Sequence, residues 1–114
     1  MSGHLPTDQL VNLSHITRKF QELALINDWQ AYHTPKNLAV AAAVEAGELL
    51  AEFQWLTAEQ SNHLSPPQKQ RVANEVADVM MYLTELCHRL DINMAEAIDA
   101  KIQLNQTRFS VDAS

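Results

Sequence analysis

Two pairs of carboxylates inside otherwise uncharged segments are the residues of this sequence whose types and spacing could do chemistry. Glu45 and Glu48 form one pair, and Glu75 and Asp78 form the other. Each pair has the spacing i, i+3, so on a helix its two side chains point to the same side. A buried carboxylate is unfavourable unless it is protonated, paired or bound to a metal, and two adjacent carboxylates repel each other. The pattern therefore predicts a site for a hard divalent cation, with Mg²⁺ favoured and Mn²⁺ as its substitute.

Two other interpretations of the acidic residues are weaker. A solvated surface location is reasonable for Glu22, Glu52 and Glu59, but the segments that carry the two pairs offer no wide polar face. A di-iron centre requires Glu-x-x-His on two helices, and this chain has one match, Glu85 and His88. We therefore interpret His88 as an ordinary helix histidine.

Length and composition favour one all-α domain over residues 1–114, with residues 1–6 and 110–114 as flexible tails. The composition is 46% hydrophobic and 19% charged, with only 2 glycines. The formal net charge is −6 and no basic stripe occurs, so a nucleic-acid polymer is not an expected partner. Free nucleotides remain compatible with this charge, because a bound metal inverts the local sign.

Cysteine usage and hydropathy favour the cytoplasm. Cys87 is the only cysteine, which excludes an intramolecular disulfide framework and fits a reducing compartment. It lies in an apolar helical run, where a buried thiol is the expected role. Neither a signal-peptide pattern nor an apolar run of membrane length occurs, so no membrane partner is expected.

Capping signals and apolar periodicity predict four helices and no strand. Cap residues followed by proline open the second and third helices, and an Asn-x-x-Glu capping box opens the fourth. The expected helices follow the caps Thr7, Thr34, Ser65 and Asn93 and end near Asn27, Trp55, Leu90 and Thr107, respectively.

The second predicted helix is apolar nearly all the way round, so we expect it to be central in a four-helix bundle. A chain this short cannot easily cover such a helix. We therefore expect a homo-oligomer, at least a dimer. Antiparallel packing of the second and third helices would bring four to five carboxylates to one pocket.

Two further groups of residues could bind a nucleotide. Lys101, Asn105 and Arg108 have the spacing i, i+4, i+7, so they share one helical face. The charge pattern is equally compatible with binding of a polyphosphate and with a solvated surface. Trp29 and Trp55 lie at expected helix edges, where they could stack on a base or pack in the core.

The ordered set of motifs from residue 28 to residue 109 resembles the MazG-type all-α nucleoside triphosphate pyrophosphohydrolases, and among them the short stand-alone members that include the dCTP pyrophosphatases. The matching elements are Asp28-Trp29, His33-Thr34-Pro35-Lys36-Asn37-Leu38, Glu45-Ala46-Gly47-Glu48-Leu49, Phe53-Gln54-Trp55, Glu75-Val76-Ala77-Asp78-Val79, Tyr82-Leu83, and Lys101 with Asn105, Arg108 and Phe109.

The resemblance implies hydrolysis of a nucleoside triphosphate to its monophosphate and pyrophosphate with Mg²⁺. It also implies a dimer, or a tetramer made of two dimers, with active sites assembled between chains. The implied roles are metal binding by Glu45, Glu48, Glu75 and Asp78, base and sugar binding by Trp29, His33, Trp55 and Tyr82, and phosphate binding by Lys101, Asn105 and Arg108.

The expected function is house-cleaning of the nucleotide pool with a dCTP-like preference. Thr17 stands where some dCTP-specific relatives carry a histidine, so strict cytosine specificity is not expected. The general base is Glu45 or Glu48, and the sequence does not choose between them. The main alternative is a nucleotide-binding, regulatory bundle with little turnover, and a third hypothesis is a purely structural helical oligomer.

Overall fold

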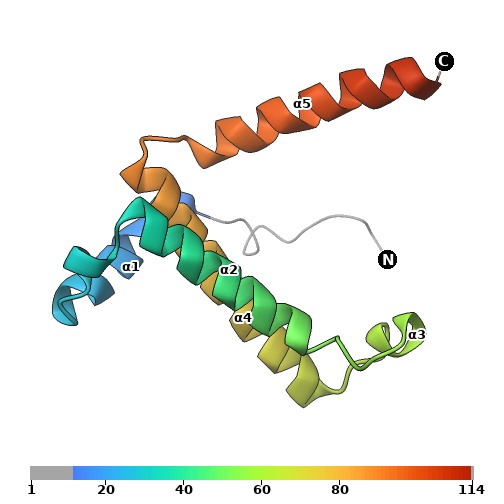
Figure 1. Ribbon diagram of the computed structural model, residues 1–114, viewed down its shortest axis with the longest axis horizontal. Helices are drawn as coiled ribbons and strands as arrows, with labels where there is room; N and C mark the ends of the chain where they lie inside the picture. The colour runs from blue at the N-terminus through green and yellow to red at the C-terminus, as the bar shows by residue number, and fades with distance from the viewer. Residues whose placement is uncertain (1–11, 114) are drawn as a thin grey trace.

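The computed structural model describes residues 12–113, with side chains described up to residue 108, and within that range the chain is helical and contains no strand. This confirms the predicted all-α class. Figure 1 shows four long helices joined by short connections that carry a 3₁₀ turn, η2, and a one-turn helix, α3. The elements are α1 (Leu13–Ile26), η2 (Gln30–Tyr32), α2 (Pro35–Ala51), α3 (Ala58–Ser61), α4 (Pro66–Arg89) and α5 (Met94–Ala113).

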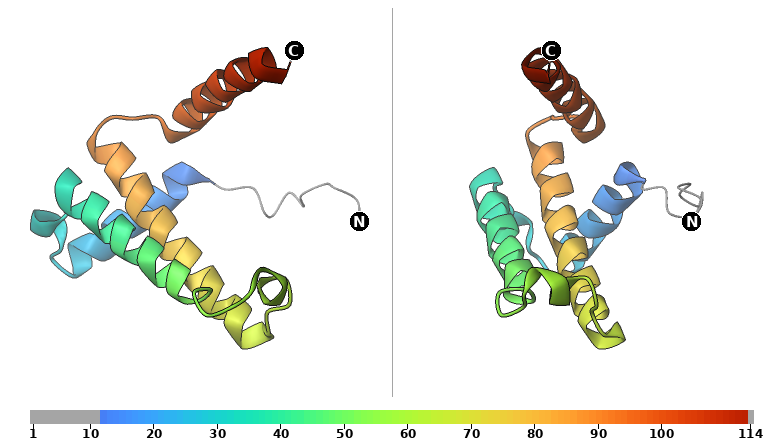
Figure 2. Two further views of the ribbon diagram at one scale, coloured as in Figure 1. Left: turned by 45° about the vertical axis from the view of Figure 1, so that its right-hand side comes forward. Right: turned by 90° about the vertical axis from the view of Figure 1, so that its right-hand side faces the viewer.

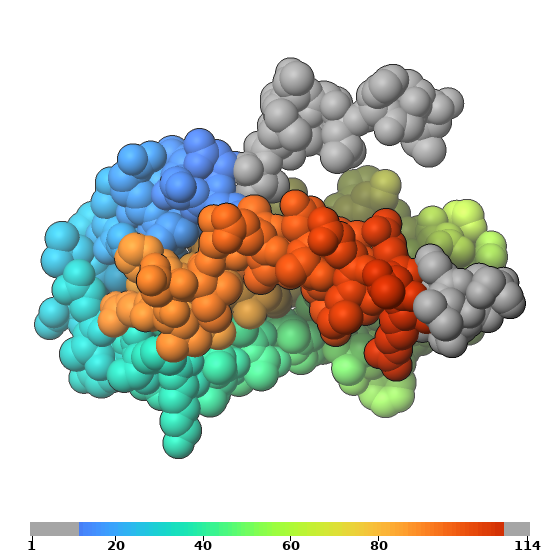
Figure 3. Space-filling model, turned by 90° about the horizontal axis from the view of Figure 1, so that it is seen from above, coloured from blue at the N-terminus to red at the C-terminus, as the bar shows by residue number. Residues whose placement is uncertain are grey.

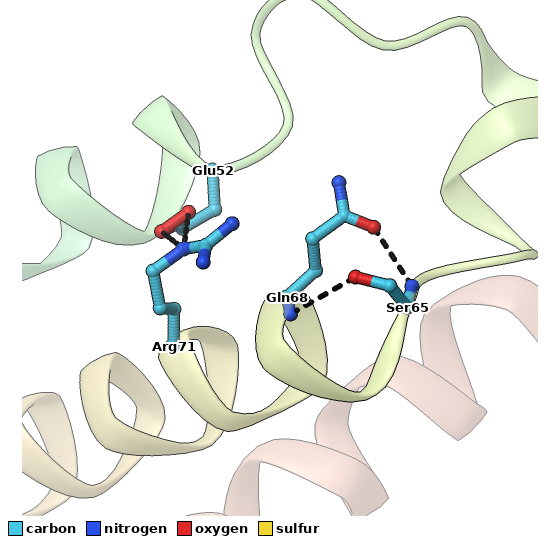
Figure 4. A network of polar contacts seen from close by, with 4 residues as sticks. All are labelled: Glu52, Ser65, Gln68 and Arg71. Atoms are coloured by element: carbon cyan, nitrogen blue, oxygen red, sulfur yellow. Dashed lines mark hydrogen bonds and ion pairs between the residues drawn. The ribbon is translucent and has the colours of Figure 1, made fainter.

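Local capping explains where three of the long helices begin. The Thr34 hydroxyl accepts a hydrogen bond from a backbone N–H of the first turn of α2, with proline at the first helical position. Ser65 and Gln68 form a reciprocal capping box at the start of α4, with N···O distances of 3.3 and 2.8 Å (Figure 4). The Asn93 side chain accepts from the backbone N–H of Glu96 at 3.0 Å and so caps α5. All three predicted starts are confirmed.

Helix α1 begins later than the sequence pattern indicated. Asn12 has extended backbone angles, and its side chain accepts from the backbone N–H of His15 at 3.0 Å, so the helix begins at Leu13. The predicted cap Thr7 and the predicted tail 1–6 lie outside the described residues.

Two predicted helix ends were also wrong. Helix α2 ends at Ala51 and gives way to successive turns, instead of continuing to Trp55. Helix α5 continues to Ala113, so residues 110–113 are helical and do not form the predicted tail. Neither end carries a glycine or proline that would have marked it in the sequence.

Helices α1 and α4 end in the same left-handed turn. Asp28 and Asp91 have φ values of 58° and 56°. In each turn the residue after the aspartate donates a hydrogen bond to a carbonyl five residues earlier: Trp29 to Ala24 at 2.8 Å and Ile92 to Cys87 at 2.8 Å. This is the Schellman arrangement, which satisfies the last carbonyls of the helix and reverses the chain sharply.

Helix α4 is the central element, because both α1 and α2 pack against it. Figure 2 shows α4 between the two other helices, and the view from above places its C-terminal end between α1 and the start of α2 (Figure 3). Helices α2 and α4 run antiparallel along most of their length (Figure 1). The expectation that the second long helix is central was therefore wrong: α2 lies at the edge of this layer.

The side chain of Arg71 ties the end of α2 to the start of α4. Its Nε lies 2.9 Å from Oε1 and 3.2 Å from Oε2 of Glu52 (Figure 4). Glu52 therefore pairs with an arginine at one end of the helix pair, and is not among the carboxylates that meet between the helices.

Helix α5 projects away from the other helices (Figures 1 and 2). Its apolar side chains Ile98, Ile102 and Leu104 are about half exposed, whereas the fully buried apolar side chains belong to α1 and α2. One chain therefore does not close into the predicted four-helix bundle by itself. No helix in the described part of the chain is both long and apolar enough to cross a membrane.

Candidate active site

Three carboxylates meet where α2 and α4 pack side by side. One carboxylate oxygen from each of Glu45, Glu75 and Asp78 lies within 4.8 Å of the others. All three residues are partly buried. The antiparallel packing of α2 and α4 brings the second predicted pair against the first, as the sequence pattern indicated. Such a donor set of oxygens suits Mg²⁺ or Mn²⁺.

The surroundings of Glu75 in this cluster raise the pKa of its carboxyl from 4.5 to about 7. The largest cause is the hydrogen bond that protonated Glu75 makes with the Glu45 carboxyl, followed by burial. The negative charges of Glu45, Asp78 and Glu48 raise the pKa further. When both carboxyls are ionised, the buried Oε2 of Glu75 has no hydrogen-bond donor among the described residues. A cation would satisfy that atom and relieve the repulsion, so the cluster fits a metal site.

Glu48 lies one turn beyond Glu45 and is exposed. It is close enough for its charge to raise the pKa of Glu75, but it is not in the group of three oxygens. The predicted four-carboxylate site is therefore arranged as three partly buried groups with a fourth at the solvent side.

Tyr82 borders the acidic cluster. It lies one turn after Asp78 on α4, and its pKa is raised by burial first and then by the charges of Glu45 and Asp78. A neutral phenol next to a carboxylate cluster keeps its proton, so Tyr82 can act as a hydrogen-bond donor beside the site.

Three aromatic rings connect the α1–α2 junction to Tyr82. His33 stacks on Phe20 with ring centroids 5.4 Å apart and an interplanar angle of 9°. Phe20 meets Tyr82 edge to face at 5.5 Å and 84°. Trp29 lies tilted against His33 at 6.0 Å. The structure thus brings three of the four predicted base-pocket residues together with Phe20, which the sequence did not single out as a site residue.

The remaining predicted site residues do not join this group within one chain. Trp55 follows the end of α2 and is 87% exposed. Lys101, Asn105 and Arg108 lie on α5, which extends away from the cluster (Figure 1). Lys101 and Arg108 are exposed, and Asn105 is partly buried.

A second polar cluster joins α1 to α4 and was not anticipated. The Glu85 carboxylate is almost completely buried, accepts from Gln21 Nε2 at 3.2 Å, and pairs with Arg89 Nε at 3.0 Å. The cluster borders a cavity of about 460 Å³ that is separate from the acidic cluster and also includes His88. Because protein donors already satisfy Glu85, the Glu85/His88 match is structural, in agreement with the interpretation of His88 as an ordinary helix residue. The i, i+4 spacing of Glu85 and Arg89 was the available signal.

The all-α fold and the carboxylate cluster between two antiparallel helices can be compared with known protein families. Residues 40–114 match the MazG-like family. The chain belongs to this family, which confirms the resemblance noted in the sequence.

The chain is similar to named pyrophosphatases over most of its length. It is 35% identical to dCTP pyrophosphatase 1 of Mus musculus over 104 residues, which cover 90% of this chain and 61% of that protein. The corresponding protein of Homo sapiens is 33% identical over 99 residues, covering 85% of this chain and 58% of that one. This chain is therefore a homologue of dCTP pyrophosphatase 1, and it spans about three fifths of the length of these curated relatives.

The fold also matches a solved structure. The crystal structure of a pyrophosphatase from Archaeoglobus fulgidus DSM 4304 superposes with a TM-score of 0.79 at 32% sequence identity, covering 96% of this chain and 98% of that one.

Proposed function

We propose that this protein hydrolyses nucleoside triphosphates, with a preference for deoxynucleotides such as dCTP, to the monophosphate and pyrophosphate. The observation that carries this proposal is the convergence of Glu45, Glu75 and Asp78 in a chain of the MazG-like family. The names of the relatives, which describe pyrophosphatases, support the same reaction.

Glu45, Glu48, Glu75 and Asp78 would hold Mg²⁺, or Mn²⁺ in its place. The donor atoms are all carboxylate oxygens, and Oε2 of Glu75 lacks a donor when the cluster is ionised. A divalent ion held there would supply charge neutralisation at the phosphate oxygens and would acidify a bound water.

The chain's own residues would orient the substrate and accept a proton. Glu45 and Glu48 are the candidates for the general base. The exposed position of Glu48, outside the close group of three oxygens, favours Glu48. Trp29, His33 and Tyr82 would bind the base and sugar next to the cluster, because aromatic faces stack on bases.

A second copy of the chain would complete the site. The 87% exposed indole of Trp55 and the half-exposed apolar residues of α5 are unfavourable in an isolated chain. Association into a dimer, or a dimer of dimers, would cover them and would allow the Lys101, Asn105 and Arg108 stripe to reach the phosphates of a substrate at the partner's cluster. Light scattering coupled to size-exclusion chromatography tests this directly, and a stable monomer would contradict it.

The test of the function is an incubation of the purified protein with a panel of dNTPs and NTPs, with and without Mg²⁺, followed by separation of the products. We expect monophosphate and pyrophosphate in wild type with Mg²⁺, and no turnover in Glu48→Gln or Asp78→Asn although both keep their helical circular dichroism. Glu22→Gln, an exposed carboxylate on α1, is the matched control and should retain activity. Binding of nucleotide without any product would favour the alternative of a regulatory bundle.

A further inference from the structure

Phe20 contacts two of the three other aromatic side chains of the candidate site, His33 and Tyr82. It is 5% exposed, and it contacts His33 with its face and Tyr82 in an edge-to-face arrangement. It comes from α1, whereas His33 precedes α2 and Tyr82 lies on α4. One side chain therefore connects three separate segments of the chain at this site.

The orientation of His33 depends on ring packing. Its Nδ1 atom is buried and has no hydrogen-bond partner among the described residues. The residue as a whole is partly buried. With no hydrogen bond at Nδ1, the stack on Phe20, with an interplanar angle of 9°, and the tilted contact with Trp29 contribute to the orientation of the ring.

Phe20 also limits where Tyr82 can lie. Tyr82 follows Asp78 by one helical turn, and its phenol is close enough to Glu45 and Asp78 for their charges to raise its pKa. The edge-to-face contact with Phe20 restrains the same ring. Helix α4 places Tyr82 relative to Asp78, and Phe20 restrains the Tyr82 ring from α1.

We propose that Phe20 is a positioning residue that aligns His33 and Tyr82 so that the base of a bound nucleotide lies at a fixed distance from the acidic cluster. The proposal rests on the function proposed above. Phe20 is not among the residues proposed to bind the metal or the phosphates, so its removal should weaken recognition of the base and leave recognition of phosphate unchanged. A residue that only stabilises the fold would affect both kinds of ligand.

The test compares the affinities of dCMP and of inorganic pyrophosphate in the presence of Mg²⁺, by calorimetry, in wild type, Phe20→Leu and Phe20→Tyr. We expect the Kd of dCMP to rise about tenfold in Phe20→Leu, since one stacked base contributes roughly the free energy of a tenfold change in affinity. The Kd of pyrophosphate should stay the same, and Phe20→Tyr, which keeps a ring, should restore dCMP binding. Ala24→Gly, one turn away on α1 and equally buried, is the control for a general loss of stability and should leave the ratio of the two Kd values unchanged.

The outcomes separate this proposal from the proposed function. Wild type that binds dCMP but turns over no triphosphate would refute the hydrolase and still allow the ratio to be measured. An unchanged ratio in Phe20→Leu, or equal weakening of dCMP and pyrophosphate binding, would overturn the positioning role. Failure of wild type to bind any nucleotide would overturn both proposals.

Discussion

The affinity of the acidic cluster for Mg²⁺ should rise steeply between about pH 6 and pH 8. Glu75 has a pKa raised to about 7 by its hydrogen bond to the Glu45 carboxyl, by burial and by the neighbouring negative charges. A metal ion must displace the proton of Glu75 before it can use that carboxylate, so binding is linked to proton release.

The size of the effect follows from the raised pKa. With a pKa of about 7, roughly one eleventh of Glu75 is ionised at about pH 6 and roughly ten elevenths at about pH 8. The apparent affinity for Mg²⁺ should therefore increase about tenfold over this interval. A glutamate with the ordinary pKa of 4.5 would be ionised at both pH values and would give almost no change.

Isothermal titration calorimetry in buffers of different ionisation enthalpy measures both the affinity and the number of protons released. Glu75→Gln should bind Mg²⁺ more weakly and should lose most of the pH dependence. Glu59→Gln, an exposed carboxylate on α3, should keep it. Equal affinities of wild type at the two pH values, or no release of protons near pH 6, would show that Mg²⁺ binds without displacing a proton from Glu75.

The same pKa predicts the stability of the metal-free protein. The folded state holds the Glu75 proton up to about pH 7, whereas the unfolded chain releases it near 4.5. The folded state thus binds more protons between these values, so the contribution of Glu75 to stability is lost as the pH rises through this range. Urea titrations should show Glu75→Gln gaining stability relative to wild type at about pH 8, and saturating Mg²⁺ should remove that advantage.

Four further substitutions have defined expected effects on stability. Arg89→Ala should destabilise the fold by about 3–5 kcal/mol because it leaves the buried Glu85 carboxylate without a countercharge. In contrast, Glu85→Gln should destabilise the fold less, since the Arg89 side chain reaches water. Denaturant titrations that rank the two variants in the opposite order would contradict this prediction. Asp91→Gly should raise stability by up to about 1 kcal/mol by relieving a φ of 56°, and a lower melting temperature would argue against strain there. Gly47→Ala should add about 0.5–1 kcal/mol in the same assay, because the added methyl group meets nothing within 4 Å in the isolated chain; a loss would point to close approach of a partner at that position.

Local sequence signals determined which segments are helical and where most helices begin. The pairs Thr34-Pro35 and Ser65-Pro66 act through contacts within one turn, so their effect could be predicted without knowledge of the fold. The i, i+3 spacing of each carboxylate pair placed both members on one side of a helix for the same reason. The family resemblance rests on these motifs and is confirmed over residues 40–114.

Tertiary packing decided the features that depend on residues far apart in the sequence. The antiparallel contact of α2 and α4 selected Glu45, Glu75 and Asp78 as the close group and left Glu48 at the solvent side, because the relative rotation of two helices is not encoded within either one. The ring contacts of Phe20 arise in the same way, from three segments that meet only in the fold.

The direction of α5 and the C-terminal end of α2 could likewise not be predicted from local sequence patterns. Helix α2 ends at Ala51 without a stop signal, next to a glutamate that pairs with Arg71 of α4. The capping box of Asn93 and Glu96 predicted the start of α5, but a signal within one helix does not say which neighbour will cover that helix. The sequence therefore determined the helices and the chemical type of the site, and only the packing of those helices against one another decided which side chains meet.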